Sequence, residues 1–102
     1  MRYQLVLQFP VSDITDFDQL IDLEGQLMVA LAGAHLVDGH DFGSGEMNIF
    51  IHTDDPTGAF ELARSVVPTT LESILTAAFR ELSSDDYQII FPEGKDGAFN
   101  VI

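Results

Sequence analysis

The sequence predicts an α+β fold, in which antiparallel strands form a sheet that packs against two helices. Stretches near the start, middle and end of the chain alternate with the two-residue period of strands, and two longer stretches have helical spacing. A short glycine-containing loop joins the two middle strands and indicates a hairpin. A chain of 102 residues, 46% of them hydrophobic, is long enough for one core and too short for two. We therefore expect a single domain over residues 1–102.

The first expected elements are a strand and a helix. Residues 3–9 alternate and place apolar side chains on one face, as in a strand buried on one side. Thr15 is a candidate N-cap, with Asp18 three residues later in a variant of the capping box. Apolar residues then recur at helical spacing over residues 17–31, and Gly33 is a typical C-terminal stop.

Residues 35–56 contain all three histidines and predict a hairpin that leads into a second helix. If Phe42 lies opposite Glu46 across the Gly-Ser-Gly loop, the mostly apolar face of the hairpin belongs to the core. A slip of one residue would bury several polar side chains, which is costly. The opposite, open face is the candidate binding surface. It consists of Asp38, His40, Phe42, Glu46, Asn48, Phe50 and His52.

The second half of the chain begins with a strong helix signal and then becomes ambiguous. Asp55 as cap and Pro56 at the first helical position predict a helix start. Residues 77–82 fit either the end of a further amphipathic helix or a strand, and both interpretations stay open. Residues 87–91 predict a strand, and residues 98–102 a short terminal strand.

The order strand, helix, hairpin, helix, strand is that of the ferredoxin-like sandwich, in which two helices cover one face of an antiparallel sheet. In that arrangement the first and third strands are central. The uncovered face would then present Gln4, Val6 and Gln8 beside the polar and aromatic side chains of the hairpin.

Three segments resemble a family of small acidic bacterial proteins of uncharacterised function. They are G-H-D-F-G-S-G-E-M-N-I-F-I-H-T-D-D-P, the opening R-Y-Q-L-V-L-Q-F-P and the late F-P-E-G. The resemblance covers most of the chain and implies a bacterial, cytoplasmic protein with a compact α+β fold. It implies no activity and no catalytic residues.

The net charge of −13 is the strongest compositional signal. Such a surface repels nucleic acids and anionic lipids, because binding either requires lysine and arginine to neutralise phosphates. Basic proteins and cations remain as partners. The chain has no cysteine, which excludes disulfides and thiolate metal sites, and no apolar run approaches a membrane span. We expect a cytoplasmic protein that binds neither nucleic acid nor membrane.

Asp38, His40, Glu46 and His52 are residue types that bind divalent metals or serve in acid–base catalysis. In the expected register, however, the two histidines lie two cross-strand pairs apart, roughly 10 Å or more, which is too far for a compact site. No nucleophile or oxyanion pattern accompanies them. We therefore expect no metal and no cofactor, and keep an enzyme or small-ligand domain that uses His40, His52 and neighbouring acids as an alternative.

The favoured hypothesis is a non-enzymatic interaction module. It would form a homodimer or dock a protein partner through the open sheet face, where Phe42 and Phe50 are apolar and the acids favour a basic partner. A narrower alternative is an acidic immunity or inhibitor protein that neutralises a basic toxin.

Overall fold

In a computed structural model that describes residues 1–11, 14–95 and 97–101, the chain has an α+β fold, as predicted. Within this described part it forms five strands and three helices. In chain order they are β1 (Tyr3–Pro10), α1 (Ile14–Ala30), β2 (Leu36–Gly43), β3 (Glu46–Thr53), α2 (Pro56–Val66), α3 (Thr69–Glu72), β4 (Thr76–Glu81) and β5 (Gln88–Phe91).

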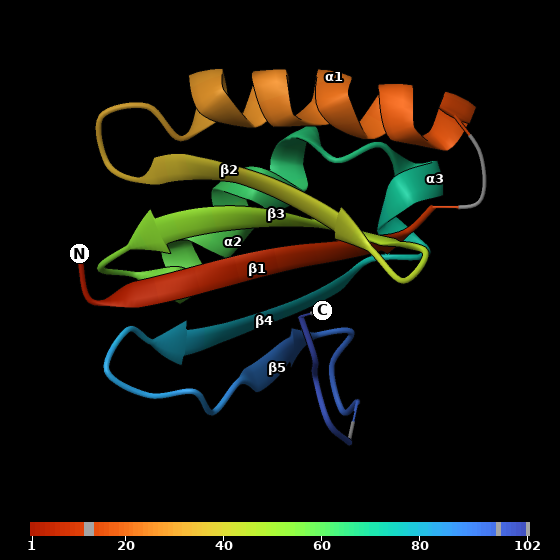
Figure 1. The fold of residues 1–102 in the computed structure, drawn as a ribbon. Helices are drawn as coiled ribbons and strands as arrows, with labels where there is room; N and C mark the ends of the chain where they lie inside the picture. The colour runs from red at the N-terminus through yellow and green to blue at the C-terminus, as the bar shows by residue number, and fades with distance from the viewer. Residues whose placement is uncertain (12–13, 96, 102) are drawn as a thin grey trace.

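The strands form one antiparallel sheet in the order β2-β3-β1-β4-β5 (Figure 1). The first and third strands are neighbours inside the sheet, as predicted, and β1 is central. Their register places Gln4 opposite His52 and Val6 opposite Phe50. The ambiguous stretch is a strand: α3 ends at Glu72, and β4 follows. The helical interpretation of residues 77–82 is therefore wrong.

The helices pack against one face of the sheet, and the hydrophobic core lies between them. Leu5, Leu7 and Phe9 of β1 point to this face and are fully buried in one cluster with Leu20 of α1 and Phe60 of α2. Figure 1 looks onto the opposite face, with α2 behind the strands. Burying a large apolar side chain stabilises a fold by about 1.5–3 kcal/mol, so this cluster is the main source of stability.

The start of α2 agrees with the sequence, whereas the start of α1 does not. The Asp55 carboxylate accepts a hydrogen bond from the Gly58 backbone N–H at 3.0 Å, and Pro56 is the first helical residue. The helix α1 begins at Ile14, so Thr15 lies in its first turn rather than before it. The side chains of residues 14–16 are outside the described part of the structure, and the proposed capping bond falls there.

The hairpin register differs from the expected one by a single residue near the turn. The loop has two residues, Ser44 and Gly45, with φ of 53° and 77°. Positive φ at both positions is the geometry that matches the twist of a tight hairpin, and it pairs Gly43 with Glu46. The predicted pair Phe42–Glu46 is wrong, because Phe42 lies opposite the core residue Met47.

Farther from the turn, a β-bulge between Val37 and Gly39 shifts the pairing by one residue and so restores the expected register. Asp38 is the additional residue on β2, so Leu36 again lies opposite His52, as predicted. The predicted pairs Asp38–Phe50 and His40–Asn48 are wrong because both lie between the turn and the end of the bulge. Only the part of β2 before the bulge keeps the expected faces.

The segment 97–101 is not a strand, contrary to the prediction for residues 98–102, whose last residue lies outside the described structure. It folds back over the sheet face opposite the helices, as Figure 1 shows. There the Asn100 carbonyl accepts a hydrogen bond from Gln8 Nε2 at 2.8 Å. The Phe99 ring packs against Tyr87 with centroids 5.1 Å apart. Val6, on the same face, is fully buried, so the face that we expected to be uncovered is covered over its β1 part.

Candidate functional site

The seven predicted binding residues are divided between the two faces of the sheet. His40 pairs with Ile49 and Phe42 with Met47, both of which face the helices. These two residues are therefore not on the open face, because the one-residue change in register rotates this part of β2 to the other side. Glu46, Asn48, Phe50 and His52 of β3 and Asp38 at the bulge remain on the open side.

Asn48 is on the open face but is not accessible. It is 1% exposed, and its Oδ1 accepts a hydrogen bond from Gln8 Nε2 at 3.0 Å. Because the same Gln8 amide donates to Asn100, the two buried polar side chains satisfy each other and hold the segment 97–101. The role of Asn48 is thus structural.

The accessible remainder of the open face is here named the β2–β3 surface. Its members are Leu36, Asp38, Glu46, Phe50 and His52. Leu36 is 53% exposed, and the Phe50 side chain is partly exposed beside buried Val6. His52 Nε2 lies 3.8 Å from Asp38 Oδ2. The surface thus combines apolar side chains with carboxylates.

On the helix side, His40 contacts a residue that the sequence did not single out. Both carboxylate oxygens of Glu24, in α1, lie 3.0 Å from His40 Nδ1. Glu24 is only 8% exposed, so the imidazole compensates the cost of burying its carboxylate. The Phe17 ring makes edge-to-face contacts with His40 and with Phe42. The sequence could have indicated this contact, because Glu24 is a charged residue at a position within the apolar stripe of α1.

His40 and His52 lie on opposite faces of the sheet, so the two imidazoles do not share one site. The third histidine, His35, has its Nδ1 2.7 Å from Thr53 Oγ1. The same hydroxyl accepts the Asp55 backbone N–H at 2.8 Å, so His35 supports the start of α2. Within the described residues, no group of three or more His, Asp or Glu side chains is arranged to hold a metal ion.

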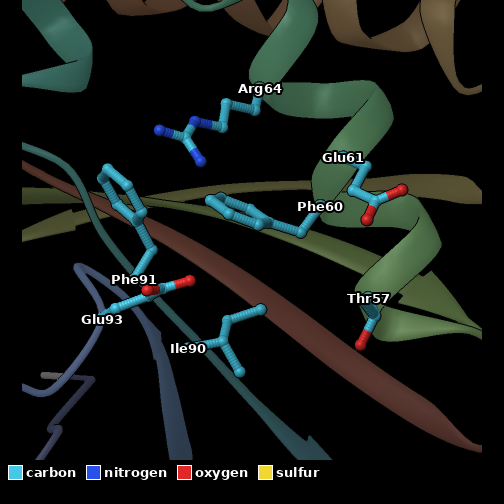
Figure 2. A pocket seen from close by; sticks show the side chains of 7 residues that line it. All are labelled: Thr57, Phe60, Glu61, Arg64, Ile90, Phe91 and Glu93. Atoms are coloured by element: carbon cyan, nitrogen blue, oxygen red, sulfur yellow. The ribbon is translucent and has the colours of Figure 1, made fainter.

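A pocket of about 590 Å³ lies between α2 and β5 (Figure 2). Its lining side chains are Thr57, Phe60, Glu61, Arg64, Ile90, Phe91 and Glu93. No sequence pattern indicates this pocket, because its two walls come from segments about 30 residues apart, and alternation and helical spacing describe each segment only separately. The pocket is named the α2–β5 pocket below.

Comparisons with protein-family models, curated proteins and solved structures found no match to this chain. Among the described residues, no helix is both long and apolar enough to cross a membrane.

Proposed function

We propose that this protein is a non-enzymatic interaction module that docks a basic protein partner through the β2–β3 surface. The observation that carries the proposal is that the segment 97–101 covers the β1 part of the open face and leaves this surface exposed. Apolar contact from Leu36 and Phe50 would supply affinity, since desolvated apolar and aromatic anchors dominate most interfaces.

Charge favours a basic partner over a second copy of the chain. Asp38 and Glu46 are part of the surface, and the net charge is −13. Arg80, a cation on the same face, is engaged: it donates to Gln4 at 3.1 Å and to three backbone carbonyls of residues 81–84 at 3.0 to 3.3 Å. Two copies would bring like charges together, whereas a basic protein would be steered toward the surface.

The strand order supports a finer description of the fold. Without β5, the order β2-β3-β1-β4 and the connections through α1 and α2 are those of a ferredoxin-like sandwich. We propose that the domain is such a sandwich with β5 added at one edge. Sheets of this kind often use the face opposite the helices for binding, which agrees with the proposed use of the β2–β3 surface. The bacterial, cytoplasmic setting that the resemblance implies belongs to the same proposal.

Site-specific crosslinking tests the docking surface. A photoreactive phenylalanine analogue replaces Phe50 in one variant and Leu62, an exposed apolar residue of α2, in the matched control. We expect one basic protein to crosslink in cells at position 50 and not at position 62. The purified partner should then bind the wild type with an association rate that falls about tenfold from low salt to physiological salt.

Two results would contradict the proposal. One is equal crosslinking from both positions, and the other is a product that consists of two copies of this chain.

Asp38→Lys provides a further check, because it reverses one charge of the surface while leaving the apolar residues in place. It should lower the association rate of the purified partner, and an unchanged rate would remove the electrostatic argument. A basic toxin as the captured protein would identify the immunity or inhibitor form of the proposal.

A further inference from the structure

The α2–β5 pocket has an apolar interior and a charged rim. Phe60 projects from α2, and Ile90 and Phe91 project from β5 (Figure 2). The Phe60 and Phe91 rings are in tilted contact, with centroids 5.5 Å apart. Thr57 and Glu61 add polar groups on the helix side. The interior thus offers aromatic and aliphatic surface at the edge of the sheet.

The cation that lines the pocket is already neutralised. Arg64 Nε donates to Glu72 Oε1 at 2.8 Å, and Nη2 of the same guanidinium lies 2.7 Å from that oxygen. The guanidinium also lies over the Phe91 ring, 4.7 Å from its centroid. Glu72 therefore offsets the positive charge that Arg64 brings to the pocket.

Two carboxylates of the rim remain for a ligand. Glu61 is on α2, and Glu93 follows β5. Within the described residues, neither takes part in an ion pair. The combination of aromatic rings with uncompensated carboxylates is the chemistry that attracts an organic cation.

We propose that the α2–β5 pocket binds a free small organic cation, a guanidinium or ammonium group on a short alkyl stem. The stem packs on Phe60 and Ile90, and the charged group reaches a carboxylate of the rim, Glu61 or Glu93. A volume of about 590 Å³ lies within the range of small-molecule sites and accommodates such a ligand. The site is on the helix side of the sheet and is independent of the β2–β3 surface.

The test uses n-butylguanidinium, with its neutral isostere N-butylurea and the anion pentanoate as matched ligands. Binding is followed by NMR through the backbone amide shifts of residues 57–64, 88–91 and 93. We expect saturable shifts of these amides with n-butylguanidinium. We expect at least about fivefold weaker binding of N-butylurea, since two exposed carboxylates together contribute roughly 1 kcal/mol.

Two double variants separate the pocket from the general acidity of the surface. E61Q/E93Q removes the rim carboxylates, and E81Q/D85N removes the same charge from exposed positions elsewhere. The first should weaken n-butylguanidinium binding about fivefold, and the second should leave it within about twofold. Equal effects of the two variants, or equal binding of the neutral or anionic ligand, would overturn the proposal.

A last comparison distinguishes a free cation from the side chain of a protein partner. The capped peptide acetyl-Gly-Arg-Gly-amide carries the same guanidinium on a peptide backbone. It should bind more weakly than n-butylguanidinium, because its backbone adds bulk at the pocket entrance. Tighter binding of the peptide would assign the pocket to an arginine of a partner and overturn the free-ligand proposal.

Discussion

Glu24 and His40 form the most buried contact between an acidic and a basic side chain among the described residues. Their separation of 3.0 Å and the burial of Glu24 contrast with the pair of His52 and Asp38, which is longer at 3.8 Å and half-exposed. A buried acceptor that loses its partner retains the full cost of desolvation, whereas exposed pairs contribute little. The two histidines should therefore respond very differently to removal.

We expect His40→Ala to lower the free energy of unfolding by about 1–3 kcal/mol, because it leaves the Glu24 carboxylate buried without its partner. His52→Ala is the matched control and should change it by less than about 1 kcal/mol. Urea denaturation of both variants measures the difference. Equal losses would show that the imidazole of His40 does not compensate the burial of Glu24.

The partner of Glu24 could not be predicted from the sequence. Helical spacing predicted most of the apolar stripe of α1: Leu20, Leu27 and Leu31 are buried, whereas Met28 is exposed. A glutamate within that stripe indicates a polar partner on the packed side, but periodicity does not say which residue supplies it. His40 was assigned to the other face because the hairpin register was wrong by one position.

The hairpin between β2 and β3 shows the same limit for an element. Alternation predicted both strands, since it depends only on the residues within each strand. Their pairing depends on where the turn begins, and Gly43, Ser44 and Gly45 allow a loop of either two or three residues. Positive φ at Ser44 and Gly45 selects the shorter loop, and the bulge at Asp38 then restores the register. Neither the length of the loop nor the position of the bulge can be read from the periodicity of the sequence.

Two glycine substitutions should have opposite effects on the stability of the fold. Gly45 has φ of 77°, so Gly45→Ala is strained and should destabilise the fold by about 1 kcal/mol. Gly25 is an exposed residue of α1, where an added Cβ would meet no atom within 4 Å. Gly25→Ala should therefore stabilise by about 0.5–1 kcal/mol. Thermal unfolding measures both, and a stabilising Gly45→Ala would contradict the turn geometry.

For the whole domain, the sequence predicted the α+β class and the neighbouring positions of β1 and β3. It did not predict how the segment 97–101 lies over the sheet. Phe99 and Asn100 are fixed by contacts with Tyr87 and Gln8, which are distant in sequence, and the segment has no regular period that would place it. The α2–β5 pocket was not predicted for the same reason, since it depends on tertiary packing alone.

The net charge of −13 has a consequence for the stability of the whole molecule. Like charges oppose the compact state, and salt screens them over a Debye length that shrinks to about 3 Å at 1 M. Sodium chloride should therefore raise the free energy of unfolding. The E81Q/D85N variant, with two fewer negative charges, should show a smaller increase. Urea titrations over a salt series test this, and an equal or larger increase in the variant would contradict it.

The bulge at Asp38 has one more consequence, for aggregation. The strand β2 is an edge of the sheet, and an exposed edge with regular backbone spacing is a template for pairing with another chain. Here the bulge interrupts that spacing, and it places a carboxylate at the interruption. A second β2 strand could therefore not add along the full edge, so the domain can expose Leu36 and Phe42 at this margin while resisting edge-to-edge assembly into fibres.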